Sequence, residues 1–73
     1  MQEPSLRAAL EEAIEALPAE LREPFVLIEI LGLSYAEASV VVGSPTGTLK
    51  SRMHRARSLL MRALEGEVET GEV

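Results

Sequence analysis

Apolar residues recur at intervals of three and four along most of the 73-residue chain, which is the spacing of amphipathic helices. Four such segments are visible, at residues 5–16, 19–32, 34–42 and 45–64. In the first two segments, apolar residues at helical spacing share one face: Leu6, Ala9, Leu10, Ala13, Ile14 and Leu17, and then Leu21, Phe25, Ile28 and Leu31. In the last two segments, the residues expected to face inward are Tyr35, Ala38, Val41 and Val42, and then Leu49, Met53, Ala56, Leu60 and Ala63. The β-branched run at 40–42 is too short for a strand and is framed by helix signals. The pattern therefore predicts an all-α fold of four helices.

Residues that start and stop helices stand at the ends of these segments. Ser5 is placed to cap the first helix, and Ser34 with Glu37 three positions later has the pattern of a capping box for the third. Gly32 and Gly43 follow the second and third segments, and glycine commonly ends a helix in a left-handed conformation. We therefore expect helix ends at both glycines and a left-handed Gly43.

The second segment contains Pro24, which lacks a backbone N–H and is disfavoured inside a helix. Two arrangements accommodate it. Either Pro24 lies in the first turn of the helix, or residues 19–23 form a short separate turn before it. We favour the first arrangement.

The fourth segment opens with Ser44 as N-cap and Pro45 at the first helical position. The third helix, a turn at Gly43 and Ser44, and the fourth helix together form a helix-turn-helix pattern. After residue 64, Gly66 and the surrounding glutamates indicate an acidic flexible tail at 65–73. Residues 1–64 then form one domain with a single small core.

Charge is separated along the chain. Residues 1–44 carry eight Glu and two Arg, a net charge of −6, and residues 65–73 carry four Glu. Residues 45–64 carry five Lys or Arg and no acid, a net charge of +5. The whole chain has a net charge of −5, which by itself argues against nucleic acid. One basic helix on an acidic body instead indicates a nucleic-acid surface.

Composition excludes several function classes. The chain has no Cys and one His, so neither a disulfide framework nor a zinc site is expected. No apolar stretch approaches the ~20 residues that span a bilayer. The glutamates of the first helix have no paired nucleophile or base, so they indicate a solvated face. We predict a cytoplasmic protein that is not an enzyme, has no cofactor or metal, and binds no membrane or small molecule.

On a helical wheel, the apolar stripe of residues 45–64 faces the core. The opposite face carries Gly47, Thr48, Ser51, His54, Arg55, Ser58 and Arg62, with Lys50, Arg52 and Arg57 on its flanks. This small, polar and basic face suits a major groove about 12 Å wide. Lys50, His54 and Arg55 can reach acceptors on purine edges, and the backbone N–H groups of residues 44–47 can hold a phosphate. For Arg62 we favour an ordinary solvated charge.

These residues carry a family resemblance. LSYAEA at residues 33–38 and GSPTGTLKSRMHRAR at 43–57 closely resemble region four of extracytoplasmic-function sigma factors, and LPAELREPFVL at 17–27 resembles the family's lead-in segment. The resemblance covers about residues 16–64. It implies a sigma region 4 fold, which is an all-α four-helix domain with a C-terminal helix-turn-helix of the winged-helix-like superfamily, without a wing.

The resemblance implies binding of double-stranded promoter DNA at the −35 element, docking on the β-subunit flap of bacterial RNA polymerase, and a candidate target for an anti-sigma factor. The family's base-contacting positions correspond to Lys50, Ser51, His54 and Arg55. Its backbone-contacting positions correspond to Tyr35, Thr48 and Arg57. The wheel and the helix N-terminus add Thr46, Gly47 and Arg52 as further backbone contacts.

The chain departs from the family at a few positions. Ile28 stands where a basic residue is common, Ala38 and Ser39 replace an Ile-Ala pair, and Val40 replaces Glu, which exposes an apolar side chain. Two alternatives stay open: a helix-turn-helix that acts mainly in protein interaction, and a DNA-binding domain of the response-regulator type. A complete sigma factor needs another domain to melt the −10 region, so we expect this chain to be a fragment of a longer one.

Overall fold

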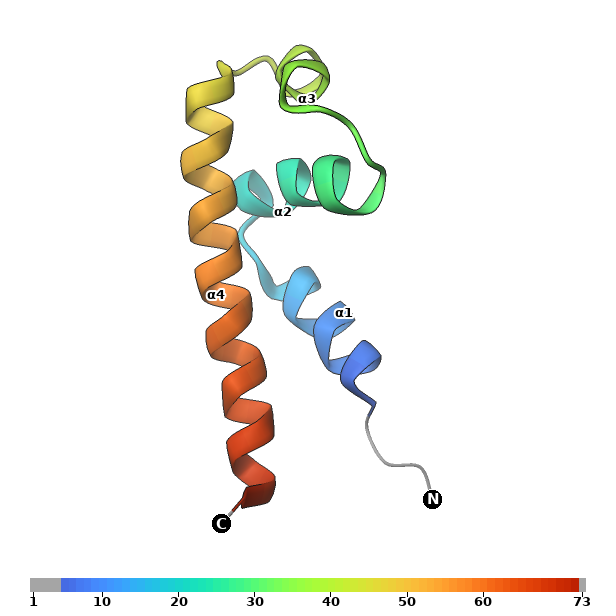
Figure 1. Ribbon diagram of the computed structural model, residues 1–73, viewed down its shortest axis with the longest axis vertical. Helices are drawn as coiled ribbons and strands as arrows, with labels where there is room; N and C mark the ends of the chain where they lie inside the picture. The colour runs from blue at the N-terminus through green and yellow to red at the C-terminus, as the bar shows by residue number, and fades with distance from the viewer. Residues whose placement is uncertain (1–4, 73) are drawn as a thin grey trace.

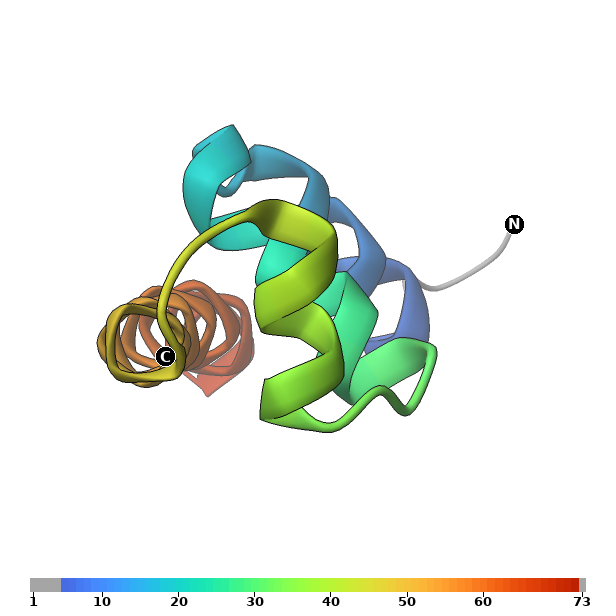
Figure 2. The same ribbon diagram turned by 90° about the horizontal axis from the view of Figure 1, so that it is seen from above.

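The computed structural model describes residues 5–72, with side chains for residues 5–66. Its elements are α1 (Leu6–Ala16), α2 (Ala19–Phe25), the π-helical turn η1 (Val26–Ile30), α3 (Tyr35–Val42) and α4 (Thr46–Glu72). The long α4 runs along the molecule, and α1, α2 and α3 are stacked against one of its sides (Figures 1 and 2). The described residues contain no strand, and the predicted all-α fold is confirmed. Within residues 5–72, no helix has the length and apolar character needed to cross a membrane.

The predicted caps at Ser5, Ser34 and Gly43 are confirmed. The Ser5 hydroxyl accepts a hydrogen bond from the Ala8 N–H at 3.0 Å. The capping box is complete, because the Ser34 hydroxyl accepts from the Glu37 N–H at 3.0 Å and the Glu37 carboxylate accepts from the Ser34 N–H at 2.8 Å. Gly43 ends α3 with a φ of 73°, in the left-handed region that glycine adopts without steric strain.

The first-turn prediction for Pro24 is wrong. Pro24 is the sixth residue of α2, and the helix continues past it into η1, where the Leu31 N–H donates to the carbonyl of Val26 at 2.9 Å. Proline removes a backbone donor and crowds the carbonyl of the preceding turn, so the hydrogen-bond ladder is disturbed here. The wide π turn of η1 follows directly after this segment. The predicted single helix at 19–32 is therefore two elements, which end at Ile30 before Gly32.

Both ends of the fourth helix differ from prediction. The helix starts at Thr46, one residue later than expected, so Pro45 and not Ser44 stands immediately before it, and the prediction of Ser44 as N-cap is wrong. The Pro45 carbonyl accepts a hydrogen bond from the Leu49 N–H at 3.1 Å. It continues to Glu72 and does not end at residue 64. Gly66 is not left-handed here, so it weakens the helix by about 1 kcal/mol relative to Ala without ending it. That residues 65–73 form an acidic flexible tail stays a prediction; Val73 and the side chains of residues 67–72 lie outside the described part of the chain.

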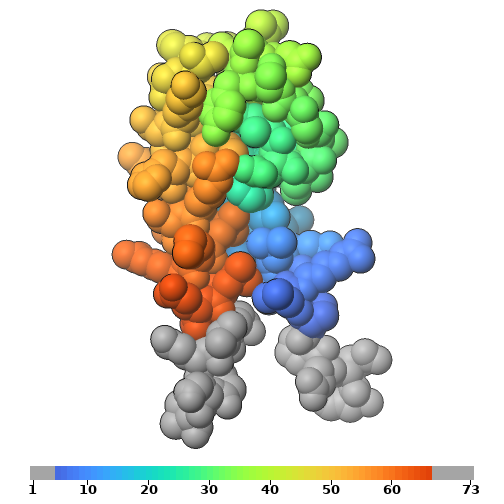
Figure 3. Space-filling model, in the orientation of Figure 1, coloured from blue at the N-terminus to red at the C-terminus, as the bar shows by residue number. Residues whose placement is uncertain are grey.

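The core lies between α4 and the three shorter helices. Its buried side chains are Leu17, Leu21, Pro24, Ala38, Leu49, Met53, Ala56 and Leu60. Four of the five predicted core positions of α4 are thus confirmed. Ala63 is exposed, because α1 separates from α4 towards this end of the molecule (Figures 1 and 3). Val41 is 58% exposed and was wrongly placed in the core, since it lies about 100° around α3 from the half-buried Val42.

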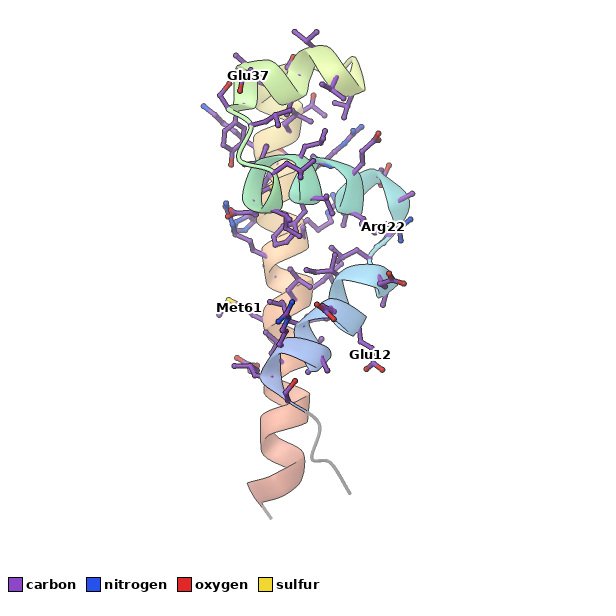
Figure 4. The ribbon with its side chains drawn as sticks, turned by 90° about the vertical axis from the view of Figure 1, so that its right-hand side faces the viewer. Glu12, Arg22, Glu37 and Met61 are labelled. Carbon is purple, nitrogen blue, oxygen red and sulfur yellow. The ribbon has the colours of Figure 1, made fainter. Side chains whose placement is uncertain are left out.

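Arg22 ties α1 to α2. Its Nη1 donates to the carbonyl of Glu15 at 3.0 Å and to the carbonyl of Leu17 at 3.2 Å (Figure 4). These carbonyls lie at the C-terminal end of α1, where helices have unsatisfied acceptors and favour a positive charge. Arg22 therefore fixes the corner between the two helices.

Candidate nucleic-acid interface

The turn between α3 and α4 is held by a small set of hydrogen bonds. The Ser39 hydroxyl donates to the Ser44 carbonyl at 2.6 Å, and the Ser44 N–H donates to the Ser39 carbonyl at 3.3 Å. The Gly43 N–H also donates to the Ser39 carbonyl, at 2.9 Å. Ser39 thus fixes the path of the chain into α4. Sequence reasoning listed Ser39 only as a departure from the family and missed this role.

Small residues let the two helices of this motif come together and leave the outer surface open. Ala38 is fully buried, where α3 packs on α4. Gly47 lies in the first turn of α4, and a Cβ added there would meet no atom within 4 Å. Its small size is therefore not required by packing inside the domain. It leaves clearance on the outer face, as the wheel predicted.

The structure places the four predicted base-contacting residues on one surface, which we call the reading edge: Lys50, Ser51, His54 and Arg55. All four are exposed. Ser51, His54 and Arg55 lie on the face of α4 opposite its buried stripe, and Lys50 lies on the flank of that face. Within residues 5–66, Lys50 and Arg55 have no carboxylate partner. Two free cations in a stretch without acid make this edge a positively charged surface.

The six predicted backbone-contacting residues border this edge. They are Tyr35, Thr46, Gly47, Thr48, Arg52 and Arg57. Thr46 and Gly47 are exposed in the first turn of α4, and Thr48 and Arg52 are partly buried. Tyr35 reaches across from the start of α3, and the Lys50 ammonium nitrogen lies 5.9 Å from the centre of its ring. At this distance a lysine interacts favourably with an aromatic face.

Arg57 differs from the other cations because it is paired. Its Nη2 donates to Oε2 of Glu29 in η1. Glu29, followed by the Tyr35 hydroxyl, raises the pKa of Arg57 above its already high ordinary value. Sequence reasoning did not select Glu29 as a site residue, although it is the single acidic residue within the apolar stretch at 25–33. Its position as an isolated acid among apolar residues was the signal from which Glu29 could have been selected.

Apolar side chains are exposed outside the reading edge. The largest exposed fractions near η1 and α3 belong to Ile30, Leu31, Val40 and Val41. A shallow groove of about 320 Å³ lies between η1 and the middle of α4, lined by Phe25, Glu29, Arg57, Leu60, Met61 and Leu64. Met61 is 61% exposed and projects outward from α4 (Figure 4). The described residues contain no cluster of His, Cys, Asp or Glu that could hold a metal ion.

Comparison with known proteins matches residues 7–60 to the family described as Sigma-70, region 4. The "Probable RNA polymerase sigma-C factor" of Mycobacterium bovis is 45% identical over 58 residues, which are 80% of this chain and 31% of that protein. The "ECF RNA polymerase sigma factor SigE" of Mycolicibacterium smegmatis is 46% identical over 55 residues, 75% of this chain and 21% of that protein. The "RNA polymerase sigma-H factor" of Pseudomonas aeruginosa is 38% identical over 60 residues, 82% of this chain and 31% of that protein. This chain therefore spans a third or less of the length of these curated relatives.

Proposed function

Because this chain belongs to the sigma-70 region 4 family, as a region 4 domain of an extracytoplasmic-function sigma factor, we propose that it binds the −35 element of bacterial promoters. The observation that carries the proposal is the N-terminal half of α4. It is exposed on one side, carries Lys50, His54 and Arg55 there, and contains no acid.

In the proposed complex, α4 lies in the major groove with its N-terminal half against the bases. Lys50 and Arg55 donate to guanine N7 and O6, and Ser51 and His54 contact neighbouring bases. A good bidentate contact contributes about 1–3 kcal/mol of discrimination against the wrong base. The free N–H groups at the start of α4 and the bordering residues other than Arg57, which is paired with Glu29, hold phosphates and set the register of the helix in the groove.

The acidic remainder of the chain restricts how DNA approaches. Outside residues 45–64, glutamates outnumber basic residues, and Arg22 is already engaged at the end of α1. DNA is repelled by these surfaces and attracted by the reading edge. The isolated chain should therefore bind in one orientation, with weak affinity that falls steeply as salt increases.

The test starts from a pool of random duplexes, from which the chain selects its preferred sequence. Fluorescence anisotropy then compares the native chain with Arg55→Ala on the selected duplex. We expect Arg55→Ala to lose about tenfold or more in affinity, since one bidentate contact is worth about 1–3 kcal/mol. Arg62→Ala is the matched control, because it removes the same charge from the exposed face of α4 two turns further on. Equal affinities for native chain and Arg55→Ala would contradict the proposal.

We also propose that the domain docks on the β-subunit flap of RNA polymerase, in the bacterial cytoplasm, and that an anti-sigma factor competes for the same surface. The support is the exposed apolar surface at Ile30 and Leu31 and the groove beside Phe25. Surfaces of this kind commonly mark protein contacts. In a pull-down with the flap, Leu31→Asp should lose capture while Arg55→Ala keeps it. The reverse result would show that the flap binds at the reading edge.

A further inference from the structure

One ion pair links the proposed DNA-binding helix to the layer beneath it. Arg57 of α4 donates to the carboxylate of Glu29 in η1, and the two side chains are 49% and 40% exposed. Lys50, Arg52 and Arg55 have no such partner within residues 5–66. The charge of Arg57 is therefore cancelled locally, while the charges of the other three are available to a ligand.

Arg57 nevertheless belongs to the surface that DNA is proposed to contact. Arg57 and Lys50 lie seven residues apart, so they occupy the same side of α4, about 10 Å from one another along its axis. Tyr35 lies between them, since its ring lies beside the Lys50 ammonium group and its hydroxyl contributes to the raised pKa of Arg57. A DNA strand that passes Lys50 and Tyr35 therefore comes close to Arg57 as well.

We propose that Glu29 is a positioning residue that withholds Arg57 from the DNA backbone. A phosphate that approaches Arg57 also approaches the Glu29 carboxylate, and the two negative charges repel each other. The phosphate contact of Arg57 forms only when the ion pair opens. Glu29 thereby lowers sequence-independent affinity and leaves the reading edge unchanged. This inference rests on the proposed function only in requiring that α4 faces duplex DNA.

The test measures, by fluorescence anisotropy, binding of the full chain to a mixed-sequence duplex of about 20 bp at about 50 and 200 mM salt. The salt slope is the fall in the logarithm of the binding constant with the logarithm of the salt concentration, and each phosphate that the protein neutralises adds about 0.9 to it. Glu29→Gln removes the negative charge and keeps the size of the side chain. It should steepen the slope by about 0.9 and tighten binding at least threefold at the lower salt concentration. Arg57→Gln alone should change affinity by less than about twofold, because the native pair makes no phosphate contact. In the double variant, the gain from Glu29→Gln should disappear.

Glu12→Gln is the matched control for net charge. Glu12 is exposed on α1 and points away from α4 (Figure 4), so its substitution should leave the salt slope unchanged. Circular dichroism confirms that each variant folds. The inference is overturned if Glu29→Gln weakens binding or leaves it unchanged, or if the double variant keeps the gain. The proposed function fails separately, when Arg55→Ala has no effect on the selected duplex.

Discussion

Met53 and Met61 allow one substitution to be made in two environments of the same helix. Met53 is fully buried, whereas Met61 is 61% exposed two turns later. Replacing a buried methionine with alanine typically costs about 2–5 kcal/mol, because transfer free energy is lost and a cavity remains. A chain of 73 residues has a total stability of about 4–11 kcal/mol. Met53→Ala should therefore remove a large share of the stability, and Met61→Ala should change it by less than about 0.5 kcal/mol.

Urea unfolding followed by circular dichroism at the helix band measures both variants. With a urea dependence of about 1 kcal/mol per molar, the midpoint for Met53→Ala should fall by about 2 M or more, and the midpoint for Met61→Ala should stay within about 0.5 M. The two substitutions change helix propensity equally, so the difference between them isolates burial. Similar midpoints for the two variants would refute the packing of α4 described above.

Substitutions at four positions test the turn between α3 and α4 and the N-cap of α3, each by the same urea assay. Gly43→Ala should destabilise the domain by about 1–2 kcal/mol, because alanine is strained in the left-handed region. Gly47→Ala should stabilise the domain by about 0.5–1 kcal/mol, because that site is helical and open. Changes in stability of the same sign for the two variants would contradict this reasoning. Ser39→Ala should cost about 1 kcal/mol by removing the hydrogen bond to the Ser44 carbonyl, and no loss would mean that this bond does not hold the turn. Ser34→Ala should cost about 1 kcal/mol, while Ser34→Asn, which keeps a capping acceptor, should cost less.

Features set by neighbouring residues could be predicted from the sequence. The capping box at Ser34 and the left-handed Gly43 depend on backbone geometry within a few positions, and both were predicted correctly. The buried stripe of α4 follows from helical periodicity and was correct as far as Leu60. The exposure of Ala63 depends instead on where α1 separates from α4, and no local pattern records that separation.

Features that depend on contacts between distant segments were missed. The Arg57–Glu29 pair joins residues 28 positions apart, and its formation requires the packing of η1 against α4. Pro24 was expected near a helix start because proline disfavours helix interiors, yet it lies in the last turn of α2 and is buried, as is Leu21. Tertiary packing of this kind overrides local preference. The positions of the reading-edge residues followed from the wheel, but their contacts with DNA stay a prediction.

Because α4 is unbroken, a rotation applied at one part of the helix also moves its other parts. Lys50 and Leu64 belong to one uninterrupted helix and lie about 21 Å apart along its axis, with Lys50 in the reading edge near the start of α4 and Leu64 in the groove near its middle. A partner in the groove that tilts α4 by about 10° about Leu64 moves Lys50 by almost 4 Å, which is about one base-pair step of 3.4 Å. A protein held in the groove can therefore shift the domain's register on DNA without touching any residue that contacts a base.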